Sequence, residues 1–339
     1  MSVHRYRKGT AVATCAIAPL ILLTACGGGD DGGGEGENVE LSLAHSYTES
    51  QPQHRCGAKV IADEVEKADV GVTVKLFPAS QLGGDADRIS SVVSGDIDMD
   101  IQGASALGAV YEPVAVLDAA YAFDDAEHLG RYFESEASTE LVKSFADETG
   151  VQTLGAWSAG MRQFTANKPI REPADLEGLR MRFPNSPQFL MNAKALGADA
   201  VEVAYEELFL ALQQGTVDGQ ENPIVNIDAI SLDEVQDNIS LSSHQANSNL
   251  VIIGEKWNEL SGEQQDALQA AVDSAVDQVP GCVEEDEKKT LADWEKSGSL
   301  EVTDDVDIEA FRTQVDSYLR DNFNEEQLAV YEGIREAAE

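Results

Sequence analysis

The sequence has few of the residues on which enzyme chemistry most often depends. It contains 4 cysteines and 5 histidines in 339 residues. No histidine pair has the His-Glu-x-x-His spacing of a zinc protease, and no Gly-x-Ser-x-Gly turn presents a nucleophilic serine. We therefore expect no enzyme activity and no metal or cofactor. An extracytoplasmic lyase or hydrolase is the weaker alternative.

A calcium site also has little support. Asp96, Asp98 and Asp100 alternate along a short predicted strand. They lack the glycine and the distal glutamate of a calcium-binding loop. We expect these acids to form a solvated strand face.

Basic residues are scarce. The chain has 23 lysines and arginines against 62 acidic residues, which gives a net charge of −39. Without Arg5, Arg7 and Lys8 of the leader, 20 basic residues remain against 62 acidic ones, a charge of −42. Nucleic acid and anionic membrane surfaces are therefore unfavourable partners. Such a surface is typical either of a protein made for high salt, where charges are strongly screened, or of an acidic secreted protein.

A long apolar run occurs only near the start of the chain. Basic residues at positions 4–8 precede an apolar stretch from Thr10 to Ala25, which is too short for a stable membrane anchor. The stretch ends in the lipoprotein cleavage pattern Leu23-Thr24-Ala25-Cys26, with Cys26 as the acylation site. We expect residues 1–25 to be a signal peptide and a lipid on Cys26 to anchor the extracytoplasmic protein to the cell membrane. An ordinary signal peptide with a chance cysteine is the alternative.

The residues after the leader divide into a tether and a body. Residues 26–38 are rich in Gly, Asp and Glu, which predicts a disordered tether. About 300 residues remain, enough for two domains of ordinary size. Two further cysteines, Cys56 and Cys282, would form a disulfide in an oxidising compartment, and closing so long a loop stabilises by roughly 4–5 kcal/mol. Two free buried thiols are the alternative.

The pattern of the body predicts an α/β fold. Strands at 39–44 and 70–77 flank a helix at 52–68, an order that favours a parallel pair with a helical crossover. A capping box at Ser261 begins a long helix to about Lys296, which we expect Pro280-Gly281 to kink or break. A last acidic helix is predicted over 307–338.

The segment from Gly178 to Pro187 provides the first candidate for a binding residue. It predicts a strand that ends at Pro184, followed by a helix with Pro187 in its first turn. Arg182 then lies at the carboxyl end of the strand, where open α/β sheets place ligand-contacting groups. Its planar guanidinium suits a carboxylate. A surface arginine on an edge strand is the alternative.

Three segments together resemble the solute-binding proteins of tripartite ATP-independent periplasmic (TRAP) transporters, the DctP family. They are Phe77-Pro78-Ala79-Ser80-Gln81-Leu82-Gly83-Gly84-Asp85, residues 180–187 and residues 211–223. The resemblance implies a two-lobed periplasmic-binding-protein-like fold with mixed sheets, crossing strands and a long lobe-spanning helix. Lobe I would comprise 39–158 with a return segment at 249–285, lobe II 159–248, and C-terminal helices at 286–339 would pack across both.

The resemblance also implies a function and a set of site residues. A small organic acid would be enclosed between the lobes and delivered to a permease driven by an ion gradient; a receptor that presents its ligand to a sensor is the alternative. We expect a monomer. The family's carboxylate-clamping arginine falls on Arg182, and the other candidate ligand contacts are Arg162, Asn222, Tyr205, Gln102, Ser105, Trp157 and His45.

Alternatives stay open for several of these contacts. Arg162 could pair with an inter-lobe acid, and Asn222 could be only a turn residue before Pro223. Trp157 is as compatible with the core as with a pocket wall, and His45 is more typical of a structural histidine. The sequence does not name the ligand, because many acids share the carboxylate that would be recognised.

Overall fold

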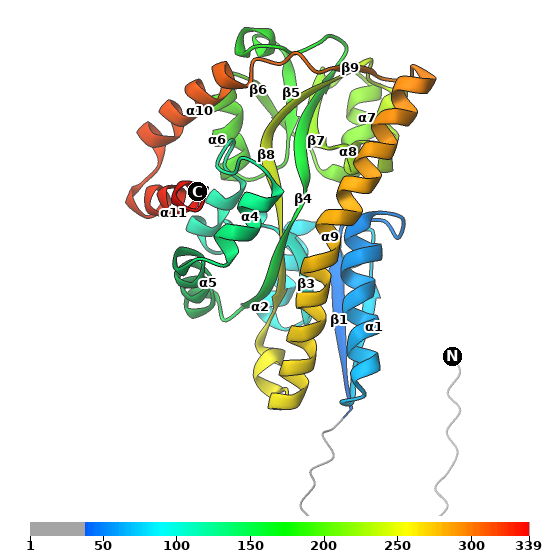
Figure 1. Cartoon of the computed structure of the whole chain (residues 1–339), viewed down its shortest axis with the longest axis vertical. Helices are drawn as coiled ribbons and strands as arrows, with labels where there is room; N and C mark the ends of the chain where they lie inside the picture. Colours follow the sequence, from blue (N-terminus) through cyan, green and yellow to red (C-terminus); the bar gives the residue numbers. More distant parts are fainter. Residues whose placement is uncertain (1–37, 339) are drawn as a thin grey trace, which may run out of the picture. The chain divides into compact units, whose positions relative to one another are not determined.

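The computed structural model describes residues 38–338, and its strands form one mixed sheet (Figure 1). The predicted signal peptide and most of the predicted tether, with Cys26, lie outside the described residues. The strand order is β2-β1-β3-β8-β4-β7-β5-β6, and β9 pairs with β8. The strands are β1 (Val39–His45), β2 (Val72–Phe77), β3 (Met99–Gly103), β4 (Gln152–Ala166), β5 (Arg180–Phe183), β6 (Asp199–Glu202), β7 (Gly219–Pro223), β8 (Asn238–Ile253) and β9 (Glu301–Thr303).

Helices cover both faces of this sheet. The α-helices are α1 (Lys59–Ala68), α2 (Asp85–Ser94), α3 (Ala104–Leu107), α4 (Ala126–Phe133), α5 (Glu136–Thr149), α6 (Pro187–Leu196), α7 (Leu208–Gln213), α8 (Ile224–Ala229), α9 (Gly262–Ser297), α10 (Ile308–Asn322) and α11 (Glu325–Glu336). Shorter turns include the π-helix η1 (Gln53–Ala58) and the 3₁₀ helices η2 (Glu112–Asp118) and η4 (Tyr205–Glu207). The predicted parallel pairing of the first two strands is confirmed, since β1 runs parallel to β2.

Two long antiparallel strands join the lobes. β8 pairs with β3 of lobe I through Asn249–Ile253 and with β9 through Asn238–Ser240. β4 runs beside β8 and pairs with β7 of lobe II through Arg162–Ala166. The register of β4 shifts between Ser158 and Met161, next to the expected lobe boundary at 158/159. The predicted two-lobed fold with crossing strands is therefore confirmed.

Gly160 allows the crossing to pack closely against α9. Its φ of +102° lies in a region that side-chain-bearing residues rarely adopt. A Cβ atom at this position would lie 2.3 Å from Oε1 of Glu287 on α9. The close approach therefore requires glycine at the point where β4 leaves lobe I.

The long helix α9 does not break at Pro280. It runs from Gly262 to Ser297 without interruption, so the expected break is absent. The helix contacts α1 of lobe I and α8 of lobe II (Figure 1). Buried apolar residues on both sides of the proline, including Val279 and Val283, hold it in place. This packing outweighs the single backbone hydrogen bond that a proline removes.

Two other predictions about local structure are wrong. The last predicted helix is two helices, because Asn324 accepts a hydrogen bond from the Gln327 amide at 2.9 Å and starts α11 afresh. Asp100 is not on a solvated face. It is fully buried on β3, and its Oδ2 accepts a hydrogen bond from Arg88 Nε at 3.0 Å.

The predicted disulfide between Cys56 and Cys282 is confirmed. It links η1 to α9 across a sequence separation of 226 residues. Within the described part of the chain, each helix is too short or too polar to cross a bilayer.

The disulfide generates a stability prediction. Replacing both cysteines, Cys56→Ser with Cys282→Ser, should lower the free energy of unfolding by about 2–5 kcal/mol, because the unfolded chain gains the freedom that the closed loop removes. Denaturant unfolding of parent and variant measures this difference. Reductant should destabilise the parent but not the variant, and equal stability of the two proteins would contradict the prediction.

Candidate functional site

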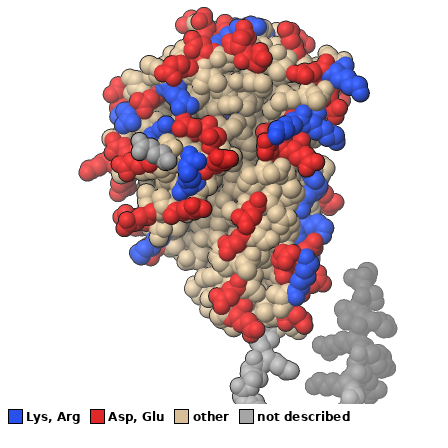
Figure 2. Space-filling view, in the orientation of Figure 1, with Lys and Arg blue, Asp and Glu red and all other residues tan. Residues whose placement is uncertain are grey.

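A cavity of about 520 Å³ is lined by residues from both lobes. Six of the predicted contacts line it: Gln102, Ser105, Arg162, Arg182, Tyr205 and Asn222. The visible surface of the protein carries many more Asp and Glu than Lys and Arg side chains (Figure 2). Two arginines, Arg162 and Arg182, line the cavity of this acidic protein, together with the acids Asp85, Asp87 and Glu206.

Arg182 is a buried guanidinium without an acid partner. Its strand, β5, lies between β6 and β7, so it is not an edge strand. Only 2% of Arg182 is exposed. Within residues 38–338 its side chain makes one hydrogen bond, from Nε to the Val203 carbonyl oxygen at 2.8 Å. No hydrogen bond of the terminal nitrogens is found within the described residues, and the alternative of a surface arginine is wrong.

The charge of Arg182 persists at neutral pH despite its burial. Burial lowers the pKa of Arg182 to about 10, while Glu221 acts in the opposite direction and Arg162 in the same one. Because this pKa still lies well above 7, the group carries a full positive charge although it is buried. A charge held there interacts more strongly with an anion than it would in bulk water.

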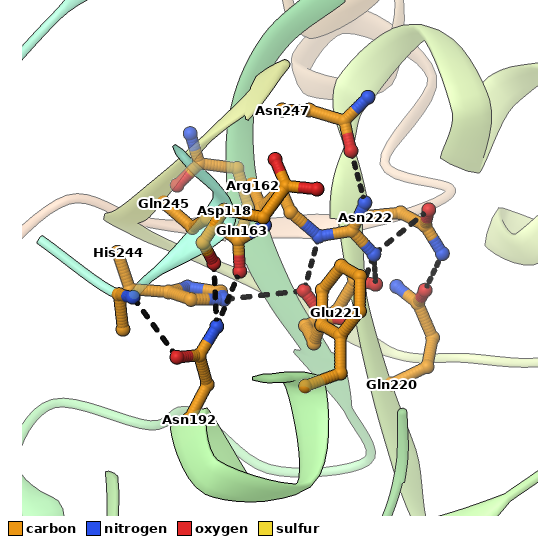
Figure 3. Close-up of polar contacts among 12 residues, drawn as sticks. Asp118, Arg162, Gln163, Asn192, Gln220, Glu221, Asn222, His244, Gln245 and Asn247 are labelled. Atoms are coloured by element: carbon orange, nitrogen blue, oxygen red, sulfur yellow. Dashed lines mark hydrogen bonds and ion pairs between the residues drawn. The ribbon is translucent and has the colours of Figure 1, made fainter. Parts of the chain in front are cut away.

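Arg162 differs because an acid of the protein neutralises it (Figure 3). Its Nε and Nη2 donate to the two carboxylate oxygens of Glu221 on β7, the second at 2.7 Å. Nη1 donates to Asn247 Oδ1 at 2.5 Å, and Nη2 also donates to Asn222 Oδ1 at 3.2 Å. Arg162 therefore pairs with an acid of the protein, which is the alternative stated for this residue. The alternative expected an inter-lobe acid, whereas Glu221 lies on the neighbouring strand.

Glu221 is itself embedded in a buried network (Figure 3). His244 Nε2 lies 3.3 Å from Glu221 Oε2, and the His244 ring stacks on Phe164 at 4.2 Å. Burial acts to raise the pKa of Glu221, but Arg162 and His244 outweigh it, and the pKa lies below its usual value. The carboxylate therefore stays ionised and fixes the orientation of Arg162.

Uncharged polar groups complete the deep part of the cavity. Gln102 is 3% exposed, and its Nε2 has no hydrogen-bond partner in the region that the structure describes. Tyr47 donates its hydroxyl to Asn249 Oδ1 at 2.9 Å, and Tyr205 donates to the Asn226 carbonyl oxygen at 3.1 Å. The unpaired amide of Gln102 is suited to donate to an oxygen of a bound molecule.

The two lobes contact each other near the cavity. Ser80 Oγ, in the turn after β2, donates to Glu206 Oε1 on η4 at 2.7 Å. Gln51 Nε2 donates to Asn226 Oδ1 on α8 at 3.0 Å. These two hydrogen bonds join lobe I to the lobe II residues Glu206 and Asn226, which line the cavity.

Two predicted contacts lie outside the cavity lining. Trp157 is 1% exposed and packs in the lobe I core against residues of α1 and α9. His45 is fully buried, and its Nε2 lies 3.1 Å from His54 Nδ1. The structure therefore corrects both assignments, because core packing and a histidine pair already occupy these side chains.

The sequence reasoning missed several cavity residues. Asn247 and Asn249 lie on β8, and Tyr47 lies just after β1. The two asparagines are spaced by two residues and therefore point to the same side of their strand. The expected return segment begins at Asn249 and leaves Asn247 out, whereas β8 contains both residues.

The fold and this site agree with a comparison to known families. Residues 43–326 match the family model of the bacterial extracellular solute-binding proteins, family 7 (DctP). The chain belongs to this family. Its match extends over both lobes and over α10.

Individual relatives support the same placement. The chain is 33% identical to the sialic acid-binding periplasmic protein SiaP of Vibrio cholerae, covering 75% of this chain and 79% of that protein. It is 32% identical to the 2,3-diketo-L-gulonate-binding periplasmic protein YiaO of Escherichia coli, over 84% and 86% of the two chains. A crystal structure of a TRAP periplasmic solute-binding protein from Polaromonas sp. JS666, bound to D-erythronate, superposes with a TM-score of 0.82 at 29% identity, covering 87% of this chain and 98% of that one.

The Arg162–Glu221 pair generates a prediction about stability. Glu221→Gln leaves the buried Arg162 without a full counter-charge and should lower the free energy of unfolding by roughly 3–5 kcal/mol. The same change at the exposed cavity residue Glu206, Glu206→Gln, should alter it by less than about 0.5 kcal/mol. Denaturant unfolding of the two variants provides the comparison, and equal effects would show that Glu221 does not balance a buried charge.

Proposed function

We propose that this chain captures a small organic acid between its two lobes and holds the ligand's carboxylate on Arg182. The observation that carries the proposal is the buried, charged and acid-free guanidinium of Arg182 in a cavity lined by both lobes. A carboxylate matches the planar fork of a guanidinium with two parallel hydrogen bonds. Each charge-assisted hydrogen bond contributes roughly 1.5–3 kcal/mol.

The net charge of the protein makes a local cation necessary. With 62 acidic residues, the chain repels an anion at long range. A site that binds an acid must therefore concentrate positive charge at short range. Arg182 supplies this charge. The charge of Arg162 is already balanced by Glu221, and its Nη2 also donates to Asn222.

The relatives support an acid as the ligand class. The three proteins named above bind, by their descriptions, sialic acid, 2,3-diketo-L-gulonate and D-erythronate. These molecules differ in size and in their hydroxyl and keto groups, but each carries a carboxylate. We infer that this chain delivers its acid to a TRAP-type permease driven by an ion gradient and that it acts as a monomer.

The role of Arg182 can be tested directly. Arg182→Ala should abolish binding of organic acids because the only acid-free guanidinium described in the cavity is lost. Arg182→Lys should also bind poorly, since an ammonium group cannot reproduce the two-pronged geometry. Isothermal titration calorimetry against a panel of organic acids measures both effects.

A matched control lies two residues away on the same strand. Arg180 is exposed and paired with Asp218, with Nη2 2.7 Å from Oδ1. Arg180→Ala should therefore leave acid binding unchanged. Loss of binding in both variants, or in neither, would reject the role proposed for Arg182.

We further propose that a lipid on Cys26 tethers the protein to the outer side of the cell membrane. The support is the sequence Leu23-Thr24-Ala25-Cys26 after a short apolar stretch, followed by a glycine-rich segment. A tether of this kind would keep the binding lobes close to a membrane permease.

Cell fractionation tests the tether. Cys26→Ala should move the protein from the membrane fraction to the soluble extracytoplasmic fraction, because the acylated thiol is removed. Cys15→Ala, a change inside the leader, should leave it in the membrane fraction. A parent protein found only in the soluble fraction would contradict the proposal.

A further inference from the structure

We propose that the ligand is a singly charged carboxylate whose far end is a hydrocarbon chain or ring. This inference rests on the proposed function, because it takes Arg182 as the site of the carboxylate. Its own basis is the division of the cavity into a deep polar part and an outer apolar part. It concerns the class of acid, which family membership leaves open.

The exposure of the lining residues separates the two parts. Arg182 and Gln102 are 2% and 3% exposed and therefore lie deep in the cavity. Val93 and Val110 line the same cavity but are 46% and 38% exposed, so they lie where it reaches solvent. A molecule that binds at Arg182 and fills the cavity extends toward these valines.

Apolar side chains from both lobes line the outer part of the cavity, beside the exposed acids Asp85, Asp87 and Glu206. We call its lobe I side the outer wall, formed by Ala86, Val93, Ala106, Ala109 and Val110. Pro184 and Pro187 of lobe II line the same cavity. None of these side chains donates or accepts a hydrogen bond, so the outer wall offers no partner to a ligand hydroxyl group.

The α2 helix shows that this apolar surface belongs to one face. Ala86, Ser90 and Val93 are spaced by four and three residues and therefore share a side of the helix. All three are exposed and line the cavity, whereas Arg88 and Val92 face the protein interior. Ser90 on this face is polar, and Asp85 and Asp87 of the same helix also line the cavity.

Exposed valines are unusual on this protein. Among the residues described, four large hydrophobic side chains are exposed: Val93, Val110, Leu210 and Ile308. Two of the four lie in one cavity, on a chain with a net charge of −39. Apolar side chains gathered in a concave site are typical of a surface that a ligand covers.

The charges around the cavity exclude a second anionic group on the ligand. Asp85, Asp87 and Glu206 also line it. Arg88 donates to Asp85 at 2.9 Å and to Asp100 at 3.0 Å, so one cation is shared by two acids. A dicarboxylate or a phosphate ester would place its second charge near these acids without a free cation to meet it.

A matched panel of six-carbon acids tests the inference on the purified full chain. The acids 2-hydroxyhexanoate, 2-hydroxyadipate and D-gluconate share a carboxylate and a 2-hydroxyl group. They differ beyond the second carbon, which carries a hydrocarbon, a second carboxylate or further hydroxyl groups. By calorimetry, 2-hydroxyhexanoate should bind at least about tenfold more tightly than the other two. Equal or tighter binding of gluconate or 2-hydroxyadipate would overturn the inference.

Two variants test whether the ligand contacts the outer wall. One changes an exposed valine of the wall, and the other changes an exposed leucine outside the cavity as a control. Val93→Asp should weaken 2-hydroxyhexanoate binding by about tenfold. It should leave binding of 2-hydroxypropanoate, which is too short to reach the wall, within about twofold of the parent. Leu210→Asp places the same charge at an exposed site outside the cavity and should change neither affinity. An unchanged affinity of Val93→Asp for 2-hydroxyhexanoate would show that the ligand does not contact the wall.

The outcomes separate this inference from the proposed function. If gluconate binds best and Arg182→Ala abolishes that binding, the carboxylate site stands and the apolar far end is wrong. If no acid of the panel binds, or if binding survives Arg182→Ala, the proposed function fails and this inference fails with it.

Discussion

Burying a positive charge without an acid partner costs free energy. The strands of lobe II nevertheless hold the guanidinium of Arg182 buried and without an acid partner. The strand that carries it lies between two others, and one backbone carbonyl holds its Nε. Its neighbour Arg162 shows the contrasting solution, since Glu221 takes most of its donors. Glu221 therefore neutralises Arg162 within the protein, whereas Arg182 has no acid partner among the described residues.

The sheet explains how polar groups from distant parts of the sequence meet at one place. β4 and β8 are shared by both lobes, and the amides of Asn222 and Asn247 converge on Arg162 from β7 and β8. α9 runs along both lobes and presses against the crossing at Gly160. Because these three elements span both lobes, any relative movement of the lobes must bend them at the crossing, next to the binding groups.

Local patterns in the sequence predicted the features that depend on neighbouring residues. The β1–α1–β2 order, the start of α9 at its capping box and the position of Arg182 at a strand end follow from periodicity and from turn residues. The split between α10 and α11 was also readable, since Asn324 and Gln327 form a capping box.

Features set by long-range packing could not be predicted in this way. The pairing of Arg162 with Glu221 depends on the register between β4 and β7. Trp157 and His45 are compatible by type with either a pocket or a core. The packing of α1 and α9 places Trp157 in the core, and the contact with His54 fixes His45. The full lengths of β4 and β8 do not follow from alternation of apolar and polar side chains: the buried middle of β8 is mostly polar, and the middle of β4 includes the small residues Ser158, Ala159 and Gly160.

The disulfide also constrains how the protein matures. A chain exported from its amino-terminal end presents Cys56 outside the cell long before Cys282, which lies 226 residues later. The bond therefore cannot close until most of the polypeptide has crossed the membrane. Until then Cys56 is a lone thiol in an oxidising compartment, open to pairing with other molecules. For a chain exported in this order, oxidation of the Cys56–Cys282 pair therefore depends on the completion of translocation.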